Sequence, residues 1–301
     1  MQGIGGVAAL PATWSPAPGS AATGAAAAPA ESGLPGADRL YAQRIRQIIL
    51  QQSKRAHVGH IGSALSIADI MAALYSAALQ IPTPHDPERD RLVLSKGHAA
   101  LALYAALYIE GWITEAQLNT YCGDDSHLGV HPEHTVRGID FSTGSLGQGL
   151  SMGAGAALAA FLQGSPRRTF VVASDAELNE GSFWEAAMFA AHHRLANLIL
   201  LVDVNRQQAF GYTADVLNLA QLPERWRAFG WDVHEVDGHD VTGLASAIAA
   251  LDTRSGPPHV LLARTVFGKG VSFMEGQIKW HYWPMSDDEY AQACAEIGGR
   301  S

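Results

Sequence analysis

The stretch Leu195-Ala-Asn-Leu-Ile-Leu-Leu-Val-Asp-Val-Asn205 (LANLILLVDVN) indicates the fold class of this 301-residue chain. Its centre, LILLV at residues 198–202, is apolar at every position. A strand with one face in water would alternate apolar and polar residues, so this run predicts a strand that is covered on both faces. Strands of this kind are typical of a parallel sheet between two layers of helices. The stretch therefore predicts an α/β fold.

Similar short runs recur along the chain and alternate with helical patterns. Strands are expected at residues 91–95, 168–174, 198–204, 231–236 and 259–265. Helices are expected at residues 66–79, 99–110, 146–162, 180–194, 222–229 and 241–251. This alternation is typical of a doubly wound parallel sheet with helices on both faces. We find no internal repeat and no linker after residue 38, so one folded domain is expected.

The two ends of the chain differ in composition. Residues 1–37 are mostly Ala, Gly, Pro and Ser, have no Lys or Arg and show no apolar periodicity, so we expect a disordered tail that lacks the early positive charge of a targeting segment. The folded α/β domain is expected over residues 38–301, starting with a helix that Asp38 caps. Helical spacing marks the apolar face of this helix at Leu40, Tyr41, Ile45, Ile48 and Ile49.

Charge and cysteine content exclude several classes of protein. Twenty basic and 29 acidic residues give a formal charge of -9, which is the wrong sign for a nucleic-acid-binding protein. A phosphorylated ligand would therefore need a cation. The longest uncharged stretch, residues 141–166, is broken by Gly, Ser and Gln, so no membrane insertion is expected.

The chain has two cysteines, Cys122 and Cys294, which lie far apart in the sequence. They favour a reducing, cytoplasmic location over a disulfide framework.

Polar side chains follow two of the expected strands. Asp175 follows the strand at 168–174, and Asn205 follows the strand at 198–204. Their spacing of 30 residues is about one strand-helix-strand unit, so neighbouring strands would bring the carboxylate and the amide to the same sheet edge. Such an oxygen pair suits Mg²⁺. The alternative is that Asp175 caps the following helix and Asn205 only turns the chain.

A glycine-rich loop, Thr143-Gly-Ser-Leu-Gly-Gln-Gly-Leu150, leads into an alanine-rich helix. Glycines at a helix start allow backbone N–H groups to approach an anion. The loop matches neither GxGxxG nor GxxxxGK[ST], so it supports neither a Rossmann dinucleotide site nor a P-loop. Gly149 to Gly153 matches the GxSxG string of a hydrolase, but Ser151 falls within a helical pattern, so we do not expect it to be a nucleophile.

Four of the 13 histidines lie in expected loops and are candidates for substrate binding or proton transfer: His60, His98, His131 and His281. Histidines at strand ends can hydrogen-bond sugar hydroxyls or shuttle protons near neutral pH. The alternative for each is an ordinary surface or core residue. Neither an HExxH motif nor a Cys/His spacing typical of zinc occurs.

From about Arg44 to Glu296 the chain resembles the thiamine-diphosphate-binding N-terminal (PP-type) domain of transketolase, in particular the small subunit of split transketolases. The motifs that carry the resemblance occur in order, and include SKRAHVGHIGSALSIADI from Ser53, VLSKGHAALALYAAL from Val93, GVHPE from Gly129, STGSLGQGLSMGAG from Ser142, VDGHD from Val236, and GKGVSFME from Gly268 followed by WH at 280–281. A further segment runs from Asp175 to Asn205.

The resemblance implies a set of functional residues. Asp175, Asn205 and the backbone carbonyl of Gln207 would bind Mg²⁺ or Ca²⁺, which holds the diphosphate of thiamine diphosphate. Gly144, Leu146, Asp175, Ala176 and Asn205 would contact the cofactor. His60, His98, His131 and His281 would line the substrate channel and assist proton transfer, and Glu180 would lie at the subunit contact.

Several residues depart from the family pattern. Ser174-Asp175-Ala176 replaces Gly-Asp-Gly, and the loss of the second glycine would cost about 1 kcal/mol if Ala176 had to adopt a positive φ. Ala209 and Phe210, Ser145 and Tyr282 also replace residues that are usual in the family. These changes lie near the expected reacting carbons and substrate channel, so they affect the prediction of the substrate more than the prediction of the cofactor.

The resemblance further implies a partner. In transketolases the glutamate that activates the cofactor's pyrimidine ring lies in a second domain, so we expect a separate pyrimidine-domain subunit in an α2β2 heterotetramer. The expected activity is transfer of a two-carbon ketol unit from a ketose, expected to be phosphorylated, to an acceptor. One alternative is a 2-oxo acid decarboxylating or acyl-transferring component, similar to pyruvate dehydrogenase, with a carrier-bound acceptor. Another is a non-catalytic subunit that only stabilises its partner.

Overall fold

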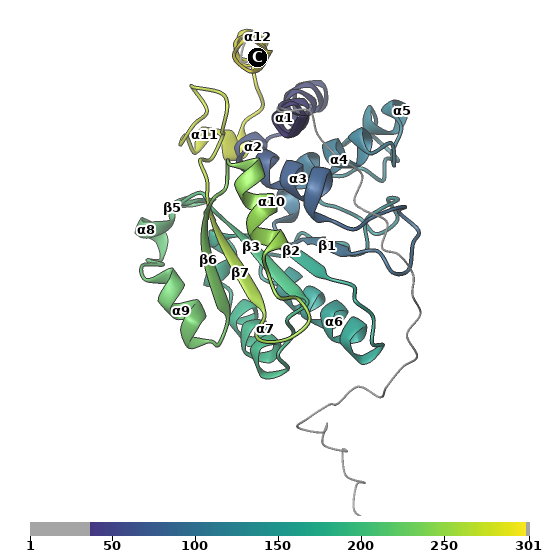
Figure 1. Ribbon diagram of the computed structural model, residues 1–301. Coiled ribbons are helices and arrows are strands. Elements are labelled where there is room, and N and C mark those ends of the chain that lie inside the picture. Colours follow the sequence, from purple (N-terminus) through teal and green to yellow (C-terminus); the bar gives the residue numbers. More distant parts are fainter. Residues whose placement is uncertain (1–36, 299–301) are drawn as a thin grey trace, which may run out of the picture. The chain divides into compact units, whose positions relative to one another are not determined.

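The fold centres on a five-stranded parallel sheet in a computed structural model, which describes residues 37–298 (Figure 1). The strand order is β1-β2-β3-β7-β6, and every neighbouring pair is parallel. The bounds are β1 Arg91–Leu94, β2 Thr169–Ser174, β3 Leu198–Val204, β6 Asp232–Asp237 and β7 His259–Arg264. The α/β class and all five expected strands are confirmed, the strands to within one residue at each end.

Successive side chains of each central strand enter two separate hydrophobic cores. In β2, Phe170 and Val172 pack in one core, and Val171 and Ala173 pack in the other. The apolar run in β3 divides in the same way. Side chains alternate across a strand, so a strand between two cores must be apolar at every position. This arrangement explains the run LILLV.

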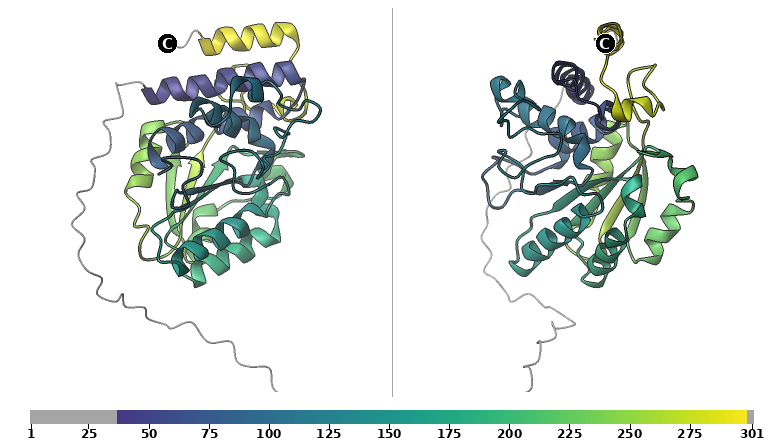
Figure 2. Two further views of the ribbon diagram at one scale, coloured as in Figure 1. Left: turned by 90° about the vertical axis from the view of Figure 1, so that its right-hand side faces the viewer. Right: turned by 180° about the vertical axis from the view of Figure 1, so that it is seen from behind.

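Helices cover both faces of the sheet (Figures 1 and 2). One face carries α6 (Gly149–Leu162), α7 (Gly181–His192) and α9 (Leu222–Ala228). The other face carries α10 (Val241–Ala249), α1 (Ala37–Ala56), α3 (Ala68–Ala73) and α4 (Ala100–Ile109). The path from β1 through β2 and β3 to β6 runs one way across the sheet, and the step from β6 to β7 runs back. Because crossover connections are right-handed, this reversal places α10 on the opposite face from α6, α7 and α9.

Two of the expected helices differ from the structure. The helix expected at 66–79 is three pieces, α2 (Ile61–Ser66), α3 and the π-helical turn η1 (Leu74–Ala78), with a break at Ile67, whose φ of -102° and ψ of 7° are not helical. The helix expected from Leu146 begins at Gly149, because Gly147 has a φ of 84°. The other four expected helices agree to within two residues at each end.

Several further elements, most of them short, were not expected from the sequence. They are the 3₁₀ turns η2 (Gly97–Ala99) and η3 (Asp175–Asn179), the hairpin of β4 (Gln207–Gln208) and β5 (Gly211–Tyr212), and the helices α5 (Glu115–Leu118), α8 (Thr213–Val216), α11 (Lys279–Tyr282) and α12 (Asp287–Gly298). Most are too short to show a clear period in the sequence.

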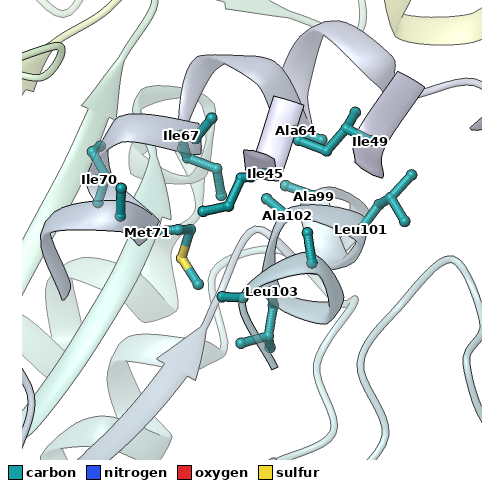
Figure 3. Close-up of a cluster of buried hydrophobic side chains, with 14 of the residues drawn as sticks. Ile45, Ile49, Ala64, Ile67, Ile70, Met71, Ala99, Leu101, Ala102 and Leu103 are labelled. Carbon is teal, nitrogen blue, oxygen red and sulfur yellow. The ribbon is translucent and has the colours of Figure 1, made fainter. Parts of the chain in front are cut away.

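Helix α1 packs as expected over most of its length. Ile45 and Ile49 are buried, and Figure 3 shows them among side chains of α2, α3 and α4. Leu40 was expected on the same face but is 64% exposed. Asp38 lies within α1 rather than before it, so the expected capping position was wrong.

Helix α12 lies along α1 (Figure 2), and the Nε2 of Gln43 donates a hydrogen bond to the carbonyl of Ile297 at 2.8 Å. All described residues belong to one compact unit. The expected disordered tail falls, apart from Ala37, outside the described residues. Within residues 37–298, no helix combines the length and apolarity needed to cross a bilayer.

Candidate active site

A cavity of about 400 Å³ lies at the carboxyl ends of β1, β2 and β3. Lys96 and His98 reach it from the segment after β1, Ala176 from the segment after β2, and Asn205 from the segment after β3. All but one of the expected cofactor, metal and catalytic residues line this cavity: His60, His98, His131, Gly144, Leu146, Ala176, Glu180, Asn205, Gln207 and His281. Strand order places the cavity within a consecutive run of strands, away from the reversal between β6 and β7.

Asp175 is the exception, since it lines a second cavity of about 590 Å³ with Arg206 and Thr213. Strands β2 and β3 are neighbours, with Ser174 paired to Asp203, so Asp175 and Asn205 follow adjacent strand ends as the spacing predicted. Asp175 is 2% exposed and does not line the first cavity, but its carboxylate accepts a hydrogen bond from the backbone N–H of Arg206, the residue after Asn205.

The two carboxylate oxygens of Asp175 have different surroundings. Oδ2 accepts hydrogen bonds from the backbone N–H of Arg206 at 2.8 Å and from the Thr213 hydroxyl at 3.3 Å. Arg206 can point its N–H there because it adopts a left-handed φ of 64°. Oδ1 is buried and has no partner. Burial and the nearby negative charge of Asp203 raise the pKa of Asp175 to about 7, and this effect outweighs the opposing charge of Lys96.

Asn205 is held in one orientation. Its Nδ2 donates to Asp203 Oδ2 at 2.8 Å, and its Oδ1 accepts from the backbone N–H of Gln207 at 2.9 Å. The Oε1 of Gln207 is buried without a partner. A carboxylate, an amide and a backbone carbonyl are the kinds of oxygen donor that Mg²⁺ and Ca²⁺ accept. The role expected for the Gln207 backbone carbonyl stays a prediction.

Asp203 and Lys96 are functional candidates that sequence reasoning missed. Both side chains are fully buried and form an ion pair. Asp203 also accepts hydrogen bonds from Ser66 at 2.7 Å, from Asn205 and from Thr265. Buried charges need partners of this kind. The signal in the sequence was an aspartate within the otherwise apolar strand LILLVDV.

Glu177 is a second residue that the sequence reasoning missed. Its side chain is fully buried and accepts hydrogen bonds from the backbone N–H groups of Gly147 and Ser174, each at 3.0 Å, and from the Ser95 hydroxyl. The glycine loop is thereby tied to the ends of β1 and β2. Burial raises the pKa of Glu177. The feature of the sequence that could have identified Glu177 is its capping-box spacing from Ser174.

The glycine loop packs too closely for side chains. Gly144 has a φ of 147°, and a Cβ built there would lie 2.9 Å from the His131 ring. A Cβ on Gly97 would lie 2.8 Å from the backbone nitrogen of Gly144. Ser151 lies inside α6, as expected, so it has none of the geometry of a hydrolase nucleophile.

Three of the four histidines form a cluster. The ring centroids of His60, His98 and His281 lie 5.1 to 5.5 Å apart. Burial lowers the pKa of His60, lowers that of His98 well below the usual range, and lowers that of His281 to about 4, so these rings are neutral at pH 7. His131 lies against Gly144 and is close enough for its charge to contribute to the lowered pKa of His60.

Unsatisfied polar groups concentrate at this cavity. Within residues 37–298, ten buried side-chain atoms lack a hydrogen-bond partner, and six of them belong to residues that line the cavity: His60, Ser174, Asn179, Gln207, Gln208 and His281. Asp175 adds a seventh next to it. Buried polar groups are normally paired, so this concentration indicates a binding site for a polar ligand.

Ala176 does not show the strain considered above. It lies in η3 and is not among the described residues with a positive φ. The replacement of the family's glycine therefore adds a methyl group beside the cavity without forcing an unfavourable backbone angle.

Residues 37–300 match the family model described as "Transketolase, thiamine diphosphate binding domain". This match and the fold define the chain as a thiamine-diphosphate-binding domain. The chain belongs to the transketolase family, as its motifs indicated.

Two relatives are themselves separate subunits. The chain is 42% identical over 258 residues to the 6-deoxy-6-sulfo-D-fructose transketolase subunit SqwG of Clostridium sp. (strain MSTE9), covering 84% of this chain and 93% of that one. It is 38% identical over 263 residues to an apulose-4-phosphate transketolase subunit of Phocaeicola vulgatus, covering 87% and 94%. The expectation of a transketolase-type enzyme subunit is confirmed.

Among solved structures, the transketolase of Campylobacter jejuni superposes with a TM-score of 0.81 at 30% identity. The alignment covers 87% of this chain but 42% of that one. The chain therefore spans less than half of an undivided transketolase.

Proposed function

We propose that residues 38–301 form the cofactor-binding half of a two-component transketolase that moves a two-carbon ketol unit from a phosphorylated ketose to an acceptor. The observation that carries this proposal is the convergence of unpartnered buried polar atoms on one cavity. Family membership gives the class of reaction, and the cavity gives the residues.

Asp175, Asn205 and the backbone carbonyl of Gln207 would hold Mg²⁺, or Ca²⁺ in its place. The buried, unpartnered Oδ1 of Asp175 and the raised pKa of this carboxyl support a cation at this point. The chain carries a formal charge of -9, so a diphosphate needs such an ion between itself and the protein.

Gly144, Leu146 and Ala176 would line the cofactor, and Glu177 would hold the glycine loop in place for it. Bound thiamine diphosphate supplies a carbon nucleophile that accepts the two-carbon unit. The chain's own contribution is to bind and orient the cofactor and to surround the reacting carbons with the histidine cluster.

The histidines would bind sugar hydroxyls and move protons. His60 and His281 each have a buried Nδ1 without a partner, and both rings are neutral at pH 7 because burial lowers the pKa of each. A neutral imidazole can donate through one nitrogen and accept through the other. This capacity suits a hydroxylated ketose better than a 2-oxo acid, which offers no hydroxyl chain.

The anionic end of the substrate needs a cation from elsewhere. Lys96 is the one Lys or Arg among the described residues that line the cavity, and its charge is paired with Asp203. The names of the two relatives indicate a sulfosugar and a sugar phosphate as their substrates. We propose that a partner subunit supplies the positive charge for a phosphate of this kind.

The proposed partner is a separately encoded pyrimidine-domain chain, in an α2β2 heterotetramer. Phe210, 87% exposed, and Val216, 39% exposed, both line the cavity, and apolar groups at such a position suit coverage by a second chain. Cys122 and Cys294 are both unpaired, which supports a cytoplasmic location.

Calorimetry with thiamine diphosphate and Mg²⁺ tests cofactor binding. Binding is expected for the native chain and should be lost in Asp175→Ala. If the native chain binds no cofactor even with its partner present, the chain is instead a stabilising subunit without catalytic function.

Product analysis tests the reaction. The chain, reconstituted with the pyrimidine-domain partner, is given xylulose 5-phosphate or pyruvate, and the two-carbon adduct is detected by mass spectrometry. An adduct from the ketose alone supports transketolase chemistry. An adduct from pyruvate alone would assign the chain to the 2-oxo acid enzymes.

A further inference from the structure

Asp232, His234 and His259 gather at the amino ends of β6 and β7, opposite the end of the sheet that carries the cavity. His234 Nε2 lies 3.0 Å, and His259 Nδ1 3.1 Å, from the same oxygen, Asp232 Oδ2. Each of the three residues offers one potential ligand atom, and these atoms lie within 4.8 Å of one another. At about 3.3 Å per residue, β7 alone separates them from the carboxyl edge by roughly 17 Å. The cluster is therefore distinct from the proposed active site.

The register of the sheet brings these residues together. Asp232 and His259 are partners in the parallel pairing of β6 and β7, so their side chains leave the same face. His234 lies two residues further along β6 and shares that face because strand side chains alternate. The cluster has no motif in the sequence, since it depends on which strand pairs with β6.

The hydrogen bonding of His259 fixes the position of its proton. Nε2 lies 3.0 Å from the backbone carbonyl of Asp252, and a carbonyl can only accept. The proton of a neutral His259 is therefore on Nε2. Its Nδ1 then points a lone pair at the carboxylate oxygen of Asp232, and two acceptors at 3.1 Å repel each other unless positive charge lies between them.

A metal ion would supply that charge, and His259, whose side chain is only 4% exposed, already has its Nδ1 directed at Asp232. A metal ion would satisfy His259, His234 and Asp232 together. The side chains of Asp232 and His234 are 46% and 33% exposed, which leaves an open side for water.

The donor set selects the class of metal. Two imidazole nitrogens and one carboxylate oxygen, with a fourth position open to water, suit Zn²⁺ and its first-row neighbours. Mg²⁺ and Ca²⁺ prefer sites made of oxygen alone. The Nε2–H of His259, bound to the Asp252 carbonyl, provides the outer hydrogen bond that orients a metal-binding histidine.

We propose that Asp232 Oδ2, His234 Nε2 and His259 Nδ1 form a binding site for a transition-metal ion of the Zn²⁺ class. The ion would join the edge strand β6 to β7 and, through Asp252, to the loop before β7. This site lies apart from ketol transfer and from the cofactor's own cation, so the proposal does not depend on the proposed function.

The test uses Co²⁺ as a spectroscopic probe of the full-length chain, cleared of metal by a chelator. Excess Mg²⁺ is present throughout to occupy oxygen-only sites. Saturable binding of one Co²⁺ per chain is expected, with the visible absorption of a four-coordinate ion. Asp232→Asn and His234→Ala should each weaken binding by about 100-fold or more, since even outer-shell partners are worth 10- to 100-fold. Circular dichroism checks that both variants fold.

Two controls locate the ion. His85→Ala removes an exposed histidine elsewhere in the chain and should leave Co²⁺ binding unchanged. His281→Ala alters the histidine cluster of the cavity and should also leave it unchanged. Loss of Co²⁺ binding in His281→Ala but not in His234→Ala would place the ion in the cavity and overturn the proposal.

A second readout uses the natural candidate ion. Zn²⁺ should raise the thermal midpoint of the native chain and of His85→Ala, but not that of His234→Ala, because an ion that binds only the folded state stabilises it. If the native chain binds no Co²⁺ and gains no stability from Zn²⁺, no metal site exists and the proposal is overturned.

Discussion

Lys96 and Asp203 form an ion pair that is completely closed off from solvent, and Asp203 in turn holds the Nδ2 of Asn205 at 2.8 Å. The pair also links three separate segments, because Ser66 donates to the same carboxylate oxygen. The residue proposed to bind the cofactor's cation is thus positioned by buried charges that never meet that cation directly.

Lys96→Met is expected to lower the free energy of unfolding by about 3 to 5 kcal/mol, because it leaves the Asp203 charge buried without a counter-ion. Urea unfolding measures the change. Lys269→Met breaks a partly exposed pair with Glu275 and should cost less than about 1 kcal/mol. Equal costs for the two variants would show that the buried pair has no special role.

Ala176→Gly is expected to lower the free energy of unfolding by about 0.5 to 1 kcal/mol, since Ala176 lies in a short 3₁₀ helix without a positive φ and glycine adds only chain entropy to the unfolded state. Denaturant unfolding of the chain without cofactor measures this. A gain in stability would mean that the alanine is strained after all.

Glu177→Gln is expected to destabilise the chain by about 2 kcal/mol or more, because the carboxylate accepts from Gly147, Ser174 and Ser95 and an amide has only one acceptor oxygen. Thermal unfolding measures the loss, and weaker cofactor binding should accompany it. The exposed Glu185 provides the matched variant, Glu185→Gln, which should unfold like the native chain.

Acid should destabilise the chain in part through His281. Burial lowers its pKa to about 4 in the folded state, from a usual value of about 6.5. Between these values the unfolded state binds more protons, so this contribution to stability falls as the pH falls from about 6.5 to 4. In urea unfolding, His281→Gln should show a shallower loss of stability over this range. His85→Gln, at an exposed site, should keep the native slope.

Phe210→Ser is expected to weaken association with the pyrimidine-domain partner by about tenfold or more, because an 87% exposed aromatic ring beside the cavity suits an interface anchor. Stability of the isolated chain should not change. Titration of one subunit with the other measures the affinity. Phe161→Ser, which alters an exposed ring on α6, is the comparison, and equal losses would remove the special role of Phe210.

The fold was largely predictable because its signals are local. All five strands of the sheet were placed to within one residue at each end, and four of the six expected helices to within two residues at each end. The failures also have local causes. The break at Ile67 and the later start of α6 arise from backbone angles that apolar periodicity does not encode, and Leu40 lies just beyond the buried stripe of α1.

The candidate site was predictable in part. The spacing of Asp175 and Asn205 indicated one sheet edge, and the motifs supplied the histidines. The partners of these residues were missed. Glu177 and Lys96 are single polar residues in the sequence, and their importance depends on being buried against the glycine loop and against Asp203.

The class of fold, the family and most residues that face the cavity follow from the order of amino acids, because apolar runs, glycines and motifs are properties of neighbouring positions. Three-dimensional packing was needed to show which charges pair, which three histidines meet and which two rings approach Asp232. These contacts join distant segments, and they exist only once strand order and register have been fixed by packing on both faces of the sheet.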